Sequence, residues 1–196
     1  MNPASRRARA ALLALVVAMA GLAGCGGPTT RYGDAGAVET VNSDFGSTDL
    51  QMLAERMTGS MLQTPAVAGG NLPIVTVQEL RNKTSEYIDT RAITNRMRAA
   101  LQRSGRVRFA TDSADMQRQR EELERQQSDL YDPERRARGG RMVGAGLRLS
   151  GEITSIVKET KDVKDVYYQL FLSLTDVQTG IEEWSDTQDI RKTTRR

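Results

Sequence analysis

Histidine is absent from this chain of 196 residues, and cysteine occurs once. A Ser-His-Asp triad, a Cys-His dyad and an ordinary zinc site with imidazole or thiolate ligands are therefore excluded. With no second cysteine for a disulfide, the fold must depend on its hydrophobic core. Paired carboxylates and a Ser-Lys arrangement remain as catalytic alternatives, but neither has a pattern in this sequence. We expect a protein that is not an enzyme and that uses no metal and no cofactor.

Long apolar runs are also scarce, and the main one, Ala10 to Leu22, is too short to span a bilayer as a helix. Three arginines precede it, which is the layout of a secretory signal. The run ends in Leu22-Ala23-Gly24-Cys25, which resembles the bacterial lipobox, where a cysteine is acylated and the chain is cleaved just before it. The resemblance implies a signal peptide over residues 1–24 and a lipid anchor on Cys25. The alternative is a secreted soluble protein whose cysteine lies there by chance.

The charge balance depends on that cleavage. The whole chain has 28 basic and 25 acidic residues, but residues 1–24 contain three arginines and no acid. Their removal leaves 25 basic residues against 25 acidic ones, a formal net charge of 0. A nucleic-acid partner is therefore not expected. Gly26 in place of aspartate implies, by the sorting pattern of such lipoproteins, the periplasmic face of the outer membrane.

After the lipidated cysteine, residues 25–47 are rich in Gly, Thr, Ser, Asp and Asn and have no apolar periodicity. This composition is typical of a flexible tether, which would reach at most about 75 Å when extended. The sequence thus predicts a tether over residues 25–47 and one globular domain over residues 48–196.

The first half of that domain predicts a βαβ unit after an initial helix. Thr48-Asp49-Leu50-Gln51 resembles a capping box, and it is followed by an apolar stripe at helical spacing. A buried strand is expected over Leu72 to Leu80, then a polar loop over Arg81 to Asp89. A second helix capped by Asp89 or Thr90 and a strand over Val107 to Ala110 complete the unit, whose strands should be parallel. The inward residues of the two helices are Leu50, Leu53, Met57 and Met61, then Ile93, Met97, Ala100 and Leu101, with Gly105 at the end.

A charged segment, Ser113 to Arg138, predicts a poorly buried surface helix with a break near Asp132-Pro133. A dense basic cluster lies at its end. The main interpretation of this cluster is a solvated helix face, and the alternative is a site for anionic glycan, lipid headgroups or an acidic partner. Its members are Arg135, Arg136, Arg138 and Arg141.

The last third of the chain has the clearest strand signals. Leu147 to Ser155 and Val166 to Thr175 alternate between apolar and polar residues, which predicts strands with one buried face. Lys158 to Asp165 should form the hairpin loop between them, and Thr179-Gly180 turns the chain into a final strand that contains Trp184. The carboxylates Glu152 and Asp176 lie in these predicted strands and are interpreted as part of a solvated strand face or a strand end rather than as catalytic groups. The predicted fold is an α/β sandwich with a mixed sheet of about five strands.

Several of these segments together resemble a known family. They are Leu80 to Thr90, Ala100-Leu101 with Ser104 to Phe109, Leu149 to Ile153, and Tyr168 to Asp176 with Thr179-Gly180 and Trp184. In this order they are similar to the outer-membrane lipoproteins of the LpoB type, which activate class A penicillin-binding proteins. The resemblance implies a domain like the amino-terminal domain of TolB. It also implies that the chain binds a bifunctional peptidoglycan synthase and activates it allosterically, without being an enzyme.

Within the matched segments, Asn82, Thr84 and Tyr87 are the candidate partner-binding residues, together with the basic cluster from Arg135 to Arg141. The alternative for the loop is structural: Asn82 and Thr84 suit bonds to local backbone, and Tyr87 could cover the helix end. Because the tether is short, an envelope assembly or scaffold lipoprotein, as in curli secretion, is a second hypothesis. A peptidoglycan-binding domain is a third.

Overall fold

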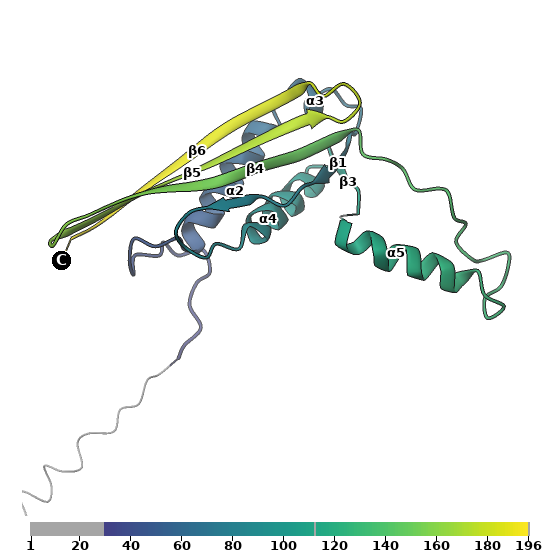
Figure 1. Cartoon of the computed structure of the whole chain (residues 1–196), viewed down its shortest axis with the longest axis horizontal. Coiled ribbons are helices and arrows are strands. Elements are labelled where there is room, and N and C mark those ends of the chain that lie inside the picture. The colour runs from purple at the N-terminus through teal and green to yellow at the C-terminus, as the bar shows by residue number, and fades with distance from the viewer. Residues whose placement is uncertain (1–29, 112, 196) are drawn as a thin grey trace, which may run out of the picture. The chain divides into compact units, whose positions relative to one another are not determined.

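A computed structural model describes residues 30–111 and 113–195 (Figure 1). The chain divides after Ala35, and the compact unit from Gly36 to Arg196 contains every helix and strand described below. The predicted signal peptide and Cys25 lie outside the described residues. Among the described helices, none combines the length and the apolar character that a membrane span requires.

The sheet of the compact unit has six strands in the order β3-β1-β4-β5-β6, with β2 paired to β4 off this path. The strands are β1 (Ile74–Val77), β2 (Arg81–Lys83), β3 (Arg108–Phe109), β4 (Leu147–Glu159), β5 (Val163–Asp176) and β6 (Glu182–Arg195). β1 is parallel to β3 and β4, whereas β4, β5 and β6 are successive antiparallel neighbours. The predicted mixed sheet is confirmed, with six strands rather than about five.

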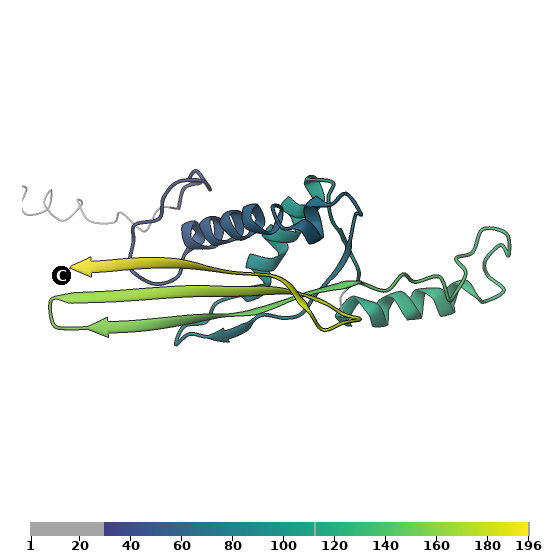
Figure 2. The same ribbon diagram turned by 90° about the horizontal axis from the view of Figure 1, so that it is seen from above.

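Helices α2 (Ser47–Met61) and α4 (Thr90–Arg103) cover one face of the sheet (Figures 1 and 2). The short α3 (Pro65–Ala68) follows α2, and α5 (Ser113–Gln126) lies between β3 and β4 in sequence. The predicted stripes are confirmed in large part, because the core is formed by apolar residues of both helices and of the inward strand positions. Fully buried members are Leu53, Met57, Met61, Ile93, Met97, Leu101, Leu149, Ile153, Tyr168, Leu170, Leu172 and Leu174.

The N-terminal cap of α4 and the glycine after its C-terminus are those predicted from the sequence. Asp89 is the N-cap, and its carboxylate accepts hydrogen bonds from the Arg91 and Ala92 amides. Gly105, two residues beyond the helix, has the positive φ of 69° that favours glycine at such a position. The parallel pairing of β1 with β3 confirms the β-strand, helix, β-strand unit.

The capping of α2 differs from the prediction. The N-cap is Gly46, whose amide donates to the Asp49 carboxylate at 2.8 Å, and Thr48 is the second helical residue. The Thr48 hydroxyl instead accepts a hydrogen bond from the Glu39 amide at 2.7 Å. The capping box predicted at Thr48-Gln51 is therefore wrong by two residues. Asp49 is the third residue of the helix, and its carboxylate bonds the amide of the N-cap residue Gly46.

The predicted strand Leu72–Leu80 and the predicted loop Arg81–Asp89 are both revised. β1 is shorter, and Leu72 has a φ of 47°, which a strand does not allow. Because β1 ends early, the edge of β4 beyond Leu149 is open, and β2 pairs there in parallel, with Arg81 opposite Glu152. The Arg81 guanidinium lies 2.9 Å from the Glu152 carboxylate.

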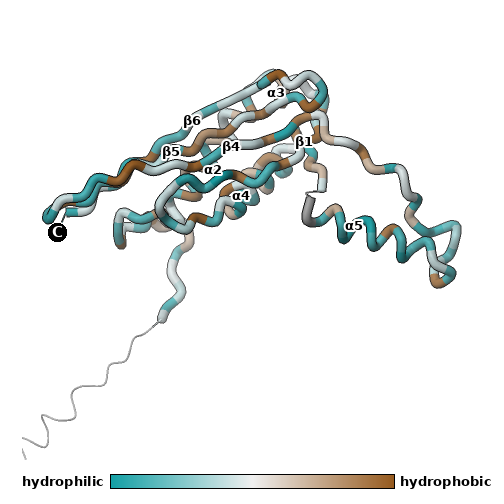
Figure 3. Tube along the Cα trace, in the orientation of Figure 1, coloured by the Kyte–Doolittle hydropathy of each residue, from teal (hydrophilic) through white to brown (hydrophobic). Residues whose placement is uncertain are grey.

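Helix α5 ends at Gln126, twelve residues before the predicted end at Arg138. The chain turns at Asp132, whose side chain accepts the Glu134 amide at 3.0 Å, and Pro133 cannot continue a helix. Most of α5 is hydrophilic, as Figure 3 shows, so there is little apolar packing to stabilise further helical turns beyond Gln126. The basic cluster is consequently not a helix face.

The hairpin between β4 and β5 is longer than predicted. Residues Lys158 to Asp165, assigned to a loop, are largely strand, and the turn is closed by the Thr160 amide donating to the Val163 carbonyl at 2.8 Å. Charges of opposite sign face each other across the strands, at Lys158–Asp165 and Glu159–Lys164. Such pairs stabilise a hairpin even where its side chains are polar.

Gly151 marks the closest approach of β4 to β5. It pairs with Leu172, and a Cβ at this position would lie 2.1 Å from the Phe171 carbonyl oxygen. A glycine inside a strand often marks such a close backbone contact. Just after β5, the predicted turn at Thr179-Gly180 is confirmed by a φ of 73° at Gly180.

Candidate functional site

The loop from Asn82 to Tyr87 is held by its own side chains. The Asn82 amide group donates to the Glu86 carbonyl at 2.8 Å, and its oxygen accepts the Thr84 amide at 2.9 Å. The Thr84 hydroxyl lies 2.7 Å from that same Asn82 oxygen and accepts the Glu86 amide at 3.2 Å. Asn82 and Thr84 thus bond local backbone, as the structural alternative expects.

Glu86 connects this loop to the body of the domain. Its carboxylate accepts a hydrogen bond from the Phe45 amide at 2.9 Å and another from the Tyr168 hydroxyl of β5. The rings of Phe45 and Tyr168 meet edge to face, with 5.6 Å between their centroids. The loop therefore has a fixed base built from three distant parts of the chain.

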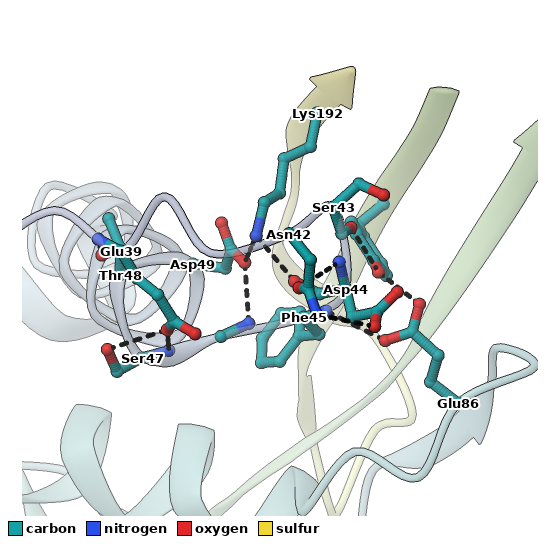
Figure 4. A network of polar contacts seen from close by, with 12 residues as sticks. Glu39, Asn42, Ser43, Asp44, Phe45, Ser47, Thr48, Asp49, Glu86 and Lys192 are labelled. Atoms are coloured by element: carbon teal, nitrogen blue, oxygen red, sulfur yellow. Dashed lines mark hydrogen bonds and ion pairs between the residues drawn. The ribbon is translucent and has the colours of Figure 1, made fainter. Parts of the chain in front are cut away.

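The segment of residues 39–46, which we call the strap, completes that base (Figure 4). Glu39 begins it, and its carboxylate accepts the Ser47 amide at 2.8 Å. Ser43 is 2% exposed, and its carbonyl lies 3.2 Å from the Tyr168 hydroxyl. The sequence assigns these residues to the flexible tether, but the structure packs them against the domain.

Two lysines of the sheet hold the strap by charge. Lys192 of β6 donates to the Asp44 carbonyl at 2.6 Å and to the Asp49 carboxylate at 2.9 Å. Lys164 of β5 pairs with the Asp44 carboxylate at 2.7 Å. The Lys192–Asp49 pair is the more enclosed, since the side chains are 16% and 5% exposed, against 26% and 48% for Lys164 and Asp44.

These contacts shift the pKa values of two members. Burial, together with the adjacent Glu86 carboxylate, raises the pKa of Tyr168, so the phenol stays protonated and acts as a donor. The hydrogen bond to Asp44 raises the pKa of Lys164. Both shifts favour the protonation states that hold the strap, and neither leaves a group suited to proton transfer near neutral pH.

Tyr87 lies outside this set of contacts. Its side chain is 95% exposed, so the expectation that it covers the helix end is wrong. An exposed aromatic ring on a loop with a fixed base is a suitable anchor for a protein partner. Whether Asn82, Thr84 and Tyr87 bind a partner stays a prediction.

The basic cluster forms a separate candidate. Arg135, Arg138 and Arg141 are exposed, and Arg136 is half-buried. The hydrogen bonds of this segment run back to α5 and the residues after it: the Ala137 amide donates to the Gln126 side chain at 2.7 Å, and the Gln127 side chain donates to the Ala137 carbonyl at 2.9 Å. In the described part of the chain, no hydrogen bond or ion pair joins the cluster to the Asn82–Tyr87 loop.

Carboxylates that could serve catalysis have structural partners. Glu152 pairs with Arg81, and Asp176 accepts the Thr179 amide at 2.7 Å, a bond that lowers the pKa of Asp176. Across residues 30–111 and 113–195, no group of three His, Cys, Asp or Glu side chains is arranged to hold a metal ion.

One basic surface escaped the sequence interpretation. Residues 90–110, which span α4 and β3, contain six arginines and no acidic residue. A count of charges within a window of about 20 residues would have found it, because its arginines are spaced more widely than those of the cluster from Arg135 to Arg141.

Comparison with known proteins bears on the whole domain. The family model described as peptidoglycan-synthase activator LpoB matches residues 49–190. No curated protein sequence matches significantly. The chain is similar to the solved LpoB C-terminal domain from Escherichia coli, with 18% identity, 74% of this chain and 99% of that chain covered, and a TM-score of 0.46.

Two further solved structures are similar. The LpoB C-terminal domain from Salmonella enterica has 18% identity, covers 74% of this chain and 99% of its own, and has a TM-score of 0.44. The lipoprotein GNA1162 from Neisseria meningitidis has 15% identity, covers 62% and 84%, and has a TM-score of 0.39. Because the family model spans most of the sequence, from residue 49 to residue 190, this chain belongs to the peptidoglycan-synthase activator LpoB family.

Proposed function

We propose that the protein is an outer-membrane lipoprotein, anchored through Cys25, that binds a class A penicillin-binding protein and activates it allosterically. The observation that carries this proposal is the family match over residues 49–190, which follows a lipobox in the same chain. The mature protein then consists of Cys25, a tether, and the compact domain, which begins at Gly36.

Activation without catalytic groups requires differential binding. A protein that binds the active conformation of a synthase more tightly than the inactive one shifts the population toward the active form. The Asn82–Tyr87 loop suits this role because its base is fixed by Glu86 while Tyr87 is exposed. Little ordering of the loop is then needed when a partner binds.

The first test is stimulation of the synthase. The unlipidated mature chain, residues 26–196, is mixed with each class A synthase of the organism, and the rate of glycan polymerisation from lipid II is measured. We expect no turnover from the chain alone, an increased rate with the cognate synthase, and a stimulation about tenfold weaker for Tyr87→Ala, typical of a lost aromatic anchor. Because Tyr87 is 95% exposed, the melting temperature of the variant should match that of the wild type.

The control for this experiment is Tyr32→Ala, which changes another fully exposed tyrosine outside the compact unit. If Tyr87→Ala stimulates as well as the wild type, the loop is only structural. If no synthase responds to the folded wild-type chain, the activator proposal fails. The short span from Gly26 to Ala35 would then favour an envelope assembly lipoprotein that acts close to the membrane.

The second test concerns the anchor. Cys25→Ser should remove the acylation site, so the protein should leave the outer-membrane fraction and incorporate no labelled fatty acid. Membrane fractionation and acyl labelling in cells measure both effects. Retention of the variant in the outer membrane with unchanged acyl label would show that the lipobox assignment is wrong.

A further inference from the structure

The strongest unassigned surface is the outer side of α4. The helix contains four arginines, Arg91, Arg96, Arg98 and Arg103, and no acidic residue, and Arg106 and Arg108 follow it directly. The mature chain is neutral overall, so this surface concentrates positive charge that acids elsewhere balance. All six side chains except Arg98 are exposed.

Helical geometry spreads these charges across one arc. At 100° per residue, Arg91 and Arg98 lie at one border of the exposed arc, and Arg96 and Arg103 lie at the other. Short or amide side chains fill the centre, at Asn95, Ala99 and Gln102. The opposite side of α4 packs into the core through Ile93, Met97 and Leu101, so the side chains of this arc point away from the core.

Arg96 and Arg106 make contacts that keep them on the surface. The Arg96 guanidinium lies 3.5 Å from the exposed Glu55 carboxylate of α2, a pair that solvent screens. Arg106 donates to the Leu62 carbonyl at 3.4 Å. A groove of about 460 Å³ is lined by Arg96 and Arg103 together with Glu55, and the short side chains of Ala99 and Ala100 in the same lining allow a charged group to approach.

The tether determines which anionic surface is near. Only residues 26–35 separate Cys25 from the start of the compact unit, because the strap belongs to the domain. Covalent geometry limits their reach to at most about 40 Å, roughly half the reach of the predicted tether. A domain on so short a chain meets the bilayer repeatedly, and phosphate headgroups complement guanidinium groups.

We propose that this surface, the arginine face formed by Arg91, Arg96, Arg103 and Arg106, binds anionic phospholipid headgroups of the membrane that holds the lipid anchor. The contact rests on the proposed anchor at Cys25 and adds an orienting role to it. With the helix layer against the membrane, the uncovered face of the sheet is turned away from it, toward other components of the envelope.

The test uses the unlipidated chain of residues 26–196 and vesicles. Co-sedimentation is measured with phosphatidylglycerol mixed into phosphatidylcholine, and with phosphatidylcholine alone. We expect binding only to the anionic vesicles, and its loss at about 1 M salt, where the screening length is about 3 Å. The triple variant Arg96→Gln, Arg103→Gln and Arg106→Gln should lower the partition coefficient by about 100-fold, since each basic residue near an anionic surface contributes about 1 kcal/mol.

A matched control removes the same positive charge elsewhere, through Lys158→Gln, Lys161→Gln and Arg195→Gln at exposed positions of β4, the β4–β5 turn and β6, and should bind like the wild type. Circular dichroism and thermal melting verify that each variant is folded. The single change Arg103→Glu provides a second variant, which should also weaken binding to anionic vesicles. Equal losses in both triple variants, or no binding of the wild type to anionic vesicles, would overturn the proposal. So would a triple variant that binds vesicles normally but no longer stimulates the synthase, because the surface would then bind an acidic protein.

The lipidated chain gives an independent measurement. It has one tryptophan, Trp184, whose energy transfer to a dansyl headgroup reports the distance of the domain from the bilayer. Transfer should be stronger in anionic than in zwitterionic vesicles, and the α4 triple variant should remove the difference. Synthase stimulation by the soluble chain is unaffected by this outcome, so failure of the membrane contact and failure of the activator proposal are distinguishable.

Discussion

Replacing Lys192 by methionine should lower the free energy of unfolding by about 3 kcal/mol. The ammonium group pairs with Asp49, whose side chain is 5% exposed, and also donates to the strap at the Asp44 carbonyl. Methionine retains most of the aliphatic stem but leaves the Asp49 carboxylate enclosed without its counter-charge, and breaking a buried pair in this way costs about 3–5 kcal/mol. Denaturant unfolding followed by circular dichroism measures the loss.

The matched control is Lys164→Met, which removes the other lysine that holds the strap. Its partner Asp44 is 48% exposed, and surface pairs contribute at most about 1 kcal/mol. We therefore expect a small change in the same assay. Similar losses for the two variants would mean that the enclosure of Asp49 does not determine the stability of the strap.

Gly151→Ala is expected to destabilise the domain by about 2 kcal/mol. The added methyl group would meet the Phe171 carbonyl oxygen at 2.1 Å and a Leu172 side-chain carbon at 2.8 Å. The two strands must separate locally, and forced overpacking of this kind costs about 1–3 kcal/mol. Thermal and denaturant melting give the difference from the wild type.

Gly59→Ala serves as the opposite control. Gly59 lies inside α2, and nothing is within 4 Å of the position that its Cβ would occupy. Alanine should raise stability there by about 0.5–1 kcal/mol, because glycine is a poor helix former. A Gly151→Ala variant as stable as the wild type would show that β4 and β5 tolerate the methyl group by sliding apart.

The helices and strands that bury one apolar face against the core could be predicted from the sequence. Leu53, Met57 and Met61 recur at helical spacing, and Leu170, Leu172 and Leu174 alternate with polar residues, because each set contacts the same core. Strand β2 has no apolar residue, and it forms because β1 stops short and leaves part of β4 unpaired. That cause lies outside the segment itself, so no local pattern could indicate it.

The candidate site was predictable to a similar degree. The bonds of Asn82 and Thr84 to local backbone follow from residue type, since both side chains commonly stabilise turns. The base beneath the loop does not follow from residue type: Glu86 contacts Tyr168, and Lys192 contacts Asp49, across 82 and 143 residues of sequence. Residues 39–46 are mostly polar and have the composition of a linker, and only their tertiary partners place them in the domain.

The strap also determines where mechanical load enters the domain. If the proposed lipid anchor on Cys25 is pulled away from a proposed partner that holds the domain, tension travels along the chain and reaches the strap before it reaches α2. The strap resists this tension through the three hydrogen bonds that join Glu39 to Ser47 and Thr48, and then through the lysine contacts at Asp44. These contacts can separate while the buried stripe of α2 stays packed, so the strap would lengthen the connection by several residues without unfolding the core.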